Sequence, residues 1–266
     1  MSERLKNWLS PSLTFVALLL VWQGVTTSGS VPDYLIPPPS RVGAAMWTVY
    51  TTGTILPHLA ATATEMILGF TAGSIAALIA ACIVAEFREV ERCVYPFIVA
   101  LQSVPKVALA PLLIVWFGFG IASKVVLVGL ICFFPVFVNA MTGLQAARPE
   151  LVDLYRAFSA TRWRIFWDVK LPSAAGAIFA GLQVGLVLAL LGAVVGEFVA
   201  AQEGLGSLIQ ASSLNFDVPV MFVCIVTLAA LGATASAIVR ALHRRIVFWE
   251  GPRAASATTT KQNGHA

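Results

Sequence analysis

Hydrophobic residues in this chain gather into long runs, and short polar or charged segments separate the runs. A helix needs about 20 largely apolar residues to cross the hydrocarbon part of a bilayer. Six runs reach or approach this length, and we predict that each forms a membrane-spanning helix. They cover about residues 13–27, 64–85, 96–117, 124–143, 173–195 and 218–242.

The first run is short enough to resemble the apolar part of a cleaved signal peptide. Arg4 and Lys6 precede it, but no clear A-x-A cleavage site follows. We therefore favour an uncleaved helix over a signal peptide. Prolines forbid a continuous helix in residues 28–40, and the apolar face of residues 41–53 predicts a short helix on the membrane surface.

Composition indicates that lipid is the main solvent of this chain. It is 58% hydrophobic and 11% charged, with a mean hydropathy of +0.85, whereas soluble domains are about 25% charged. So few polar residues cannot cover a surface that faces water. We predict an all-α polytopic membrane protein with a small, polar, disordered tail at residues 250–266.

Positive charge sets the orientation of the predicted spans, because cytoplasmic loops are enriched in Lys and Arg. If both termini are cytoplasmic, all of the 17 Lys and Arg residues except Arg41, Lys106 and Lys124 fall in cytoplasmic segments. These segments include the turn at 86–92 and the loop at 146–171. The same rule explains the net charge of +4. No basic run interleaved with aromatic residues is present, so we predict no nucleic-acid partner.

Side chains that support catalysis or metal binding are scattered along the chain. The four cysteines lack CxxC spacing, and the three histidines have no neighbours that suggest chemistry. The sequence contains no G-x-x-x-x-G-K-[ST] phosphate loop, so ATP would be hydrolysed by another subunit. A membrane enzyme therefore fits poorly. An ion-coupled secondary transporter also fits poorly, because Glu65 is the sole acid deep in a predicted span and no repeat is evident.

The segment at 146–171 is longer than a loop that only reverses the chain. Glu150 and Asp153 lie near the start of a predicted helix, where acids suit the helix dipole. Aromatic residues beside Arg are typical of a protein interface. We therefore predict that a cytoplasmic partner binds here, and a solvated loop that only fixes topology is the alternative. The apolar residues form two groups, namely Leu151, Leu154, Tyr155 and Phe158 at helical spacing, then Trp163, Ile165, Phe166 and Val169.

This loop resembles the EAA signature of ATP-binding cassette (ABC) importer permeases. The signature reads acid-Ala-Ala, three residues, Gly, about nine residues, an apolar residue, one more residue, and Leu-Pro. Placing Leu171 and Pro172 on its Leu-Pro sets Asp153 on the acid and Val169 on the apolar position. Leu154, Tyr155 and Ser159 stand where the signature has Ala, Ala and Gly. The resemblance therefore implies that the cleft of the partner that receives this loop has a different shape.

The resemblance covers roughly residues 60 to 249 and points to the nitrate/sulfonate/taurine branch of these permeases. It is carried by residues 101–126, 133–163, 196–210 and 244–249. It implies a type I importer permease (MetI-like) fold, with an N-terminal helix and extracytoplasmic segment at 1–60 and a permease core at 61–249.

The resemblance also implies a role and partners. The chain would be a homodimeric, non-enzymatic permease of the bacterial inner membrane, would bind no cofactor itself, and would work with an extracytoplasmic solute-binding protein. A separate ATPase subunit would bind ATP and Mg and would contact the loop. The coupling residues would be Asp153, Tyr155, Arg156, Phe158, Ser159, Ala160, Thr161, Arg162, Leu171 and Pro172.

Lys106 lies about ten residues into the third predicted span, where a charge is costly unless it faces protein or water. One interpretation is a cation beside the path of an anionic solute, aided by Gln102 and Ser103. The other is a Lys paired with Glu65 or Glu197 across the bundle. We leave both open.

Glu197 ends the fifth predicted span, and we expect it at an extracytoplasmic rim beside the pathway. Nearby glycines, including Gly181, Gly185 and Gly192, recur at a spacing that predicts close helix packing. The expected substrate is a small anion such as nitrate, a sulfonate or taurine. A pyrimidine or other vitamin precursor is the alternative.

Overall fold

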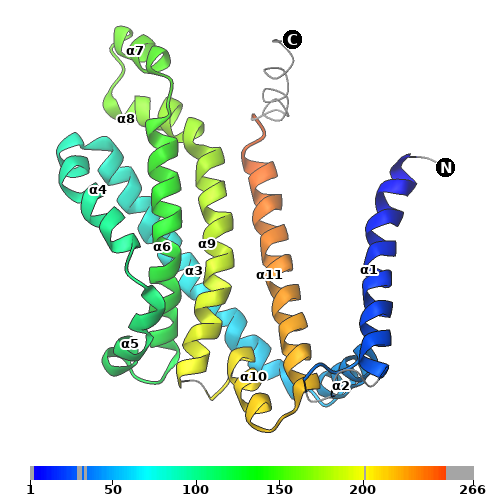
Figure 1. Ribbon diagram of the computed structural model, residues 1–266. Helices are drawn as coiled ribbons and strands as arrows, with labels where there is room; N and C mark the ends of the chain where they lie inside the picture. The colour runs from blue at the N-terminus through cyan, green and yellow to red at the C-terminus, as the bar shows by residue number, and fades with distance from the viewer. Residues whose placement is uncertain (1–2, 29–31, 33–34, 201, 250–266) are drawn as a thin grey trace, which may run out of the picture. The chain divides into compact units, whose positions relative to one another are not determined.

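The computed structural model describes residues 3–28, 32, 35–200 and 202–249, and the regular structure within these ranges is entirely helical. The predicted all-α class is therefore confirmed, while the tail at 250–266 lies outside the described residues. The elements in Figure 1 are α1 (Glu3–Thr27), α2 (Pro39–Thr51), α3 (Ile55–Glu86), α4 (Arg88–Gln102), η1 (Lys106–Leu109), α5 (Ala110–Phe117), α6 (Ile121–Gln145), α7 (Pro149–Ala157), α8 (Arg162–Ile165), η2 (Phe166–Lys170), α9 (Leu171–Ala200), α10 (Leu205–Leu214) and α11 (Val218–Ile246).

Four helices are long and apolar enough to cross a membrane, and they coincide with the second, fourth, fifth and sixth predicted spans. The first predicted span lies within α1, whose apolar part, Val16–Thr27, is shorter. The four long helices are Ile55–Glu86, Ile121–Gln145, Arg162–Val199 and Val218–Ile246.

The third predicted span is not a continuous helix. The segments Glu89–Gln102 and Lys106–Phe117 meet at a bend of 86°. Pro105 lies at this break, has no N–H to continue the helical ladder, and disfavours helical geometry at Val104. The result is a broken span or a re-entrant loop instead of the straight helix that we predict from apolar length.

The chain forms two compact units, which we describe separately. The first unit combines Met1–Thr64 with Ala193–Leu231, and the second combines Glu65–Gly192 with Gly232–Ala266. In the first unit, Val42, Met46 and Val49 of α2 pack with Ile55 and Leu205. The apolar face of α2 therefore contacts protein, although we predict from the sequence a helix that rests on the membrane surface.

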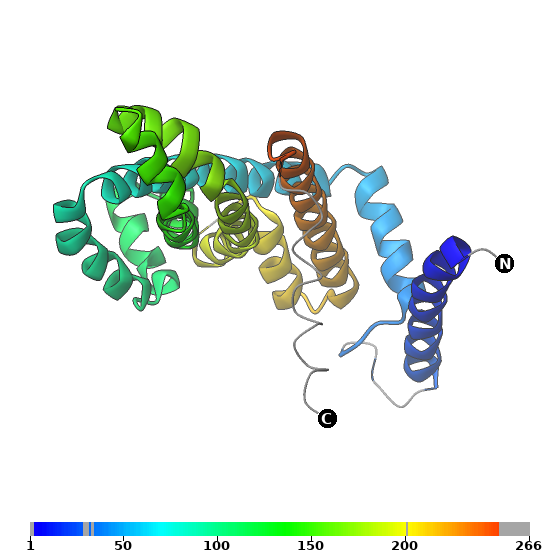
Figure 2. The same cartoon turned by 90° about the horizontal axis from the view of Figure 1, so that it is seen from above.

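The second unit is organised around α6, α9 and α3. Figure 2 looks along α6 and α9, with α3 crossing them and α4 and α5 on one side. A Cβ added to Gly181 would lie 2.8 Å from the Cβ of Asn139 in α6, and Gly185 and Gly192 also face α6 side chains. The close packing predicted from the glycine spacing is therefore confirmed at these three positions.

Candidate functional site

The predicted docking loop folds into two short helices, α7 and α8, joined by a turn. In Figure 1 they lie beyond the ends of α6 and α9. Pro149 occupies the first turn of α7, where its missing N–H has no intrahelical partner to lose. The N-cap of α8 is Thr161, whose Oγ1 accepts a hydrogen bond from the backbone N–H of Arg164 at 3.4 Å.

The second half of the loop is built into a membrane-spanning helix. The π-helical turn η2 connects α8 directly to α9, so one helix runs from Arg162 to Val199. Ile165, Phe166 and Val169 are buried, whereas Trp163 is 70% exposed. The second predicted apolar group thus divides into three anchoring residues and one surface residue. No loop separates α8 from α9.

The first half of the loop presents an uncovered apolar surface. None of the residues of α7 is buried in the described chain, and Leu154 is 50% exposed. Phe158 follows the helix and is 80% exposed. Apolar side chains that stand out from an anchored base are typical of a surface that a partner covers.

Asp153 of α7 forms an ion pair with Arg156. Its Oδ1 accepts a hydrogen bond from Nη1 of Arg156 at 3.2 Å, and both side chains are about two-thirds exposed. Arg148 is the N-cap residue of α7 and makes no side-chain capping bond. Exposed pairs of this kind contribute at most about 1 kcal/mol, so Asp153 affects the charge of the surface more than its stability.

Ser159 occupies the position of the glycine in the EAA signature, and its φ of 56° lies in the left-handed region. Its N–H donates to the carbonyl of Arg156 at 2.9 Å, and the N–H of Ala160 donates to the carbonyl of Tyr155 at 3.0 Å. These two bonds form a Schellman motif, which ends many helices at a glycine. The departure at Ser159 therefore retains the turn, at a cost of about 1 kcal/mol for a left-handed residue that has a Cβ.

A Ser159→Gly substitution is expected to stabilise the end of α7 by about 1 kcal/mol, because glycine adopts a positive φ without steric cost. Hydrogen exchange at the amides of α7 should slow about fivefold. Ser173→Gly is the matched control, since Ser173 lies in the helical start of α9. Glycine should speed local exchange there. Faster exchange in α7 after Ser159→Gly would show that the left-handed turn is not the conformation in solution.

Three of the candidate pathway residues, Gln102, Ser103 and Lys106, lie at the break in the third span. Lys106 donates from Nζ to the backbone carbonyl of Gln102 at 2.7 Å, and Nζ lies 4.4 Å from the centre of the Phe134 ring. Gln102 and Ser103 are exposed, and Lys106 is partly exposed. The three predicted residues therefore lie together, and their role in a pathway stays a prediction.

Glu65 forms its ion pair with Lys124, a residue to which we assigned no role from the sequence. Both side chains are almost completely buried, at 2% and 10% exposed. The suggested pairing of Lys106 with Glu65 is therefore wrong. The missed signal was the presence of two opposite charges in apolar runs, because charges inside a membrane usually pair with one another.

Glu197 is fully buried in the first unit, at the end of α9. Its Oε1 accepts from the hydroxyl of Thr62 at 2.6 Å, and its Oε2 accepts from the N–H of Gly206 at 2.5 Å. The hydroxyl oxygen of Thr62 accepts from the N–H of Leu205 at 2.8 Å. We call Thr62, Glu197 and the backbone of residues 204–206 the clasp. It places a carboxylate at the N-terminus of α10, where such a charge is favourable.

The clasp leaves no space for side chains at its glycines. A Cβ on Gly204 would lie 2.3 Å from Cδ of Glu197, and Gly204 has a φ of 132°, which favours glycine. A Cβ on Gly206 would lie 2.7 Å from Oε2 of the same carboxylate.

Among the described residues, no group of three or more His, Cys, Asp or Glu side chains could hold a metal ion.

Comparisons with known proteins agree with these features. Residues 69–248 match the family described as binding-protein-dependent transport system inner membrane component. The riboflavin transport system permease protein RibX of Chloroflexus aurantiacus is 39% identical, over 90% of this chain and 89% of that protein. The formylaminopyrimidine transport permease protein ThiX of Halalkalibacterium halodurans is 32% identical, over 91% and 96%. The taurine transport system permease protein TauC of Escherichia coli is 29% identical, over 90% and 88%.

The fold also has a counterpart among solved structures. The inward-facing methionine ABC transporter MetNI matches with a TM-score of 0.64 and 19% identity, over 75% of this chain and 97% of that chain. The expected type I importer permease fold is thereby confirmed. The chain therefore belongs to the binding-protein-dependent transport system inner membrane component family, the non-catalytic permease subunits of ABC importers.

Proposed function

We propose that this chain forms half of the solute pathway of an importer and that an ATPase subunit docks on α7 and α8. The observation that carries the proposal is the contrast within the loop. Phe158 and Trp163 are 80% and 70% exposed, while Ile165 and Phe166 are each 5% exposed and anchor the same loop in the second unit. Such a surface can receive a partner on one side and act on a membrane helix on the other.

In the proposed mechanism, ATP and Mg bind to the partner ATPase, and closure of that partner displaces α7 and α8. The continuous helix from Arg162 carries this displacement into the fifth span. Inward-open and outward-open states then exchange because ATP binds them with different affinity. A second copy of the chain completes the pathway as a homodimer in the bacterial inner membrane. Both termini lie in the cytoplasm, as the distribution of Lys and Arg favours.

For the substrate, we favour a nitrogen heterocycle of the vitamin or vitamin-precursor class. The relatives named for riboflavin and formylaminopyrimidine are 39% and 32% identical to this chain. The relative named for taurine is 29% identical. The binding protein would deliver the compound. Our first expectation from the sequence, a small anion, is the second candidate, and Lys106 supports it.

The surroundings of Lys106 bear on the second candidate. The ammonium group lies over the face of Phe134, and Phe134 is 8% exposed, so its ring is not open for a solute to stack on. A partly desolvated ammonium can bind an anionic group.

The docking proposal is tested by purifying a tagged chain gently from its native membrane and identifying the proteins that accompany it. Phe158→Asp places a charge in the exposed apolar surface. Asp153→Arg reverses the charge at residue 153 on the same surface. Each change should reduce the recovery of an ATPase subunit at least tenfold, a loss of about 1.4 kcal/mol or more.

The matched control for these two variants is Glu203→Arg, a charge reversal at an exposed acid in the segment between α9 and α10. It should leave the ATPase bound. Recovery of the ATPase with both loop variants at the level of the unmodified chain would contradict docking at α7 and α8.

A further inference from the structure

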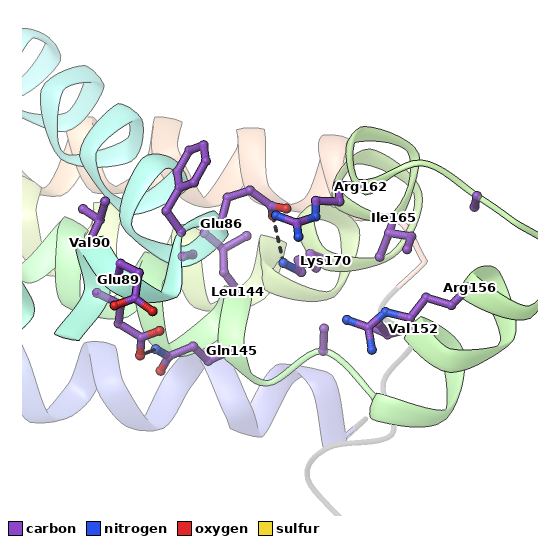
Figure 3. Close-up of a pocket in the computed structure, with 15 residues that line it drawn as sticks. Glu86, Glu89, Val90, Leu144, Gln145, Val152, Arg156, Arg162, Ile165 and Lys170 are labelled. Atoms are coloured by element: carbon purple, nitrogen blue, oxygen red, sulfur yellow. Dashed lines mark hydrogen bonds and ion pairs between the residues drawn. The ribbon is translucent and has the colours of Figure 1, made fainter.

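Residues 86–92 end α3 and begin α4, and we call them the turn, as predicted from the sequence. An ion pair ties the turn to the docking loop. Nζ of Lys170, at the end of η2, donates to Oε2 of Glu86, at the end of α3, at a distance of 2.8 Å. Figure 3 shows the two side chains reaching toward each other across the gap between their helices. They are 23% and 19% exposed, so solvent screens this pair much less than the pairs on α7 and α8.

A second hydrogen bond holds the other side of the same turn. Nε2 of Gln145, the last residue of α6, donates to Oε1 of Glu91 at 2.7 Å. The turn is therefore attached both to the end of α6 and to the residue that immediately precedes the Leu-Pro of the loop.

Apolar residues from the same three elements, α3, α4 and η2, pack together in one cluster. Val84 of α3, Phe166 of η2 and Ile98 of α4 are buried in one hydrophobic cluster, and Val90 packs against it. Close-packed side chains transmit displacement, because interiors have low compressibility. The end of the docking loop, the turn and α4 therefore belong to one mechanically connected core.

A cavity of about 1050 Å³ lies between the first docking helix and this turn, with Val152 and Arg156 of α7 on one wall and Glu89 and Glu91 on another. The labelled Arg156 projects toward this space in Figure 3. A displacement of α7 and α8 consequently reaches the turn through η2, where Lys170 contacts Glu86.

Beyond the turn, α4 runs to Gln102 and ends at the break that carries Lys106. We propose that the Lys170–Glu86 ion pair is a coupling link that carries movement of the ATPase-docking loop to the broken third span. Lys170 and Glu86 act as positioning residues and have no contact with ATP or substrate. This inference rests on the proposed docking of an ATPase at the loop.

The test follows two reporter cysteines in the complex of the full chain with its ATPase, in a background whose four native cysteines are replaced by alanine. Ala157→Cys reports on the docking loop and Ser103→Cys on the break; both positions are exposed. The measured quantity is the rate of labelling by a water-soluble maleimide, without nucleotide and with Mg-ATP plus vanadate. With the ion pair intact, nucleotide should change both rates at least about fivefold, the lower end of typical coupling between sites.

Lys170→Met should preserve the change at Ala157→Cys and reduce the change at Ser103→Cys to less than about twofold, because the loop still moves but the break no longer follows. Lys170→Arg keeps the charge and should behave like the unmodified chain. Exchanging the charges, with Glu86→Lys and Lys170→Glu together, should restore the response at the break.

Arg164→Gln is the matched control, because it removes an exposed ion pair to Asp168 from the same loop, at 3.4 Å. It should change neither reporter. The link is refuted if both reporters keep their response in Lys170→Met, or if Arg164→Gln uncouples them equally. If nucleotide changes the labelling rate of neither reporter while the Lys170–Glu86 ion pair is intact, the docking proposal itself is refuted. If the charge exchange does not fold, the comparison of Lys170→Met with Lys170→Arg decides.

Discussion

A Lys124→Met substitution is expected to remove most of the folded protein from the membrane, because it leaves the carboxylate of Glu65 in an apolar interior without its cation. Glu65 and Lys124 are 1% and 8% exposed as whole residues. Removing one partner of such a pair costs about 3–5 kcal/mol, which is a large share of the roughly 5–15 kcal/mol that separates folded from unfolded states.

The geometry of α3 explains why the ion pair forms where it does. Glu65, Gly69 and Gly73 are spaced at intervals of four residues and so lie on one face of the helix. A Cβ on Gly69 would lie 2.5 Å from Cβ of Val128, and one on Gly73 would lie 2.4 Å from the carbonyl oxygen of Gly129. The glycines let α3 and α6 approach closely, and this approach brings Glu65 within reach of Lys124.

The measurement is the yield and the melting temperature of the monodisperse protein in mild detergent. The double substitution Glu65→Met and Lys124→Met should recover much of the loss, since two apolar side chains can replace a buried pair at little cost. Lys106→Met is the control, because it makes the same change at a partly exposed lysine and should leave folding intact. Equal stability of Lys124→Met and the unmodified chain would contradict a buried structural pair.

Glu197→Leu is expected to destabilise the first unit by about 1–3 kcal/mol. The substitution leaves the buried N–H of Gly206 without its acceptor, and a buried unsatisfied group costs about 1–3 kcal/mol. The hydroxyl of Thr62 loses its bond to Glu197 but can still donate to the carbonyl of His58, at 3.1 Å. Glu197→Gln retains one oxygen acceptor and should lose less. Gly206→Ala should also be strongly destabilising, because its Cβ would lie 2.9 Å from the carbonyl oxygen of Val194.

Thermal unfolding of these variants measures the effect directly. Glu203→Leu is the matched control, because Glu203 is exposed and lies six residues after Glu197, and its melting temperature should stay close to that of the unmodified chain. A Glu197→Leu variant as stable as Glu203→Leu would mean that the clasp does not hold α10. The carboxylate would then have another role.

Apolar run length predicted the positions of the long helices well, because a span must satisfy its backbone within the lipid. It did not predict the 86° bend. Pro105 marked a weak point in the third span, but the direction and size of a bend depend on packing that no local pattern contains.

The docking loop shows the same division between local and tertiary information. The helical spacing of Leu151, Leu154 and Phe158 correctly predicted α7. The left-handed φ of Ser159 could have been predicted from its alignment with a glycine. The continuity of α8 with α9 through a π-helical turn could not.

Contacts between distant residues could not be predicted from the sequence. The role of Glu197 beside the pathway stays a prediction, but its hydrogen bond to Thr62, which lies 135 residues earlier in the chain, has no local signal. Lys170 was counted only as a positive charge in a predicted cytoplasmic segment, and no partner was predicted for Glu86, 84 residues earlier. Charge distribution predicts the side of a membrane on which such residues lie, but not the residues that they contact.

Uptake by reconstituted vesicles tests the central claim most directly. The chain is placed in liposomes with its ATPase, and the binding protein is added with the compound that it retains on purification. The account predicts accumulation that requires ATP on the ATPase side, requires the binding protein, persists when ion gradients are dissipated, and is abolished by Phe158→Asp. Accumulation by the chain alone, driven by a proton or sodium gradient and unaffected by Phe158→Asp, would contradict it.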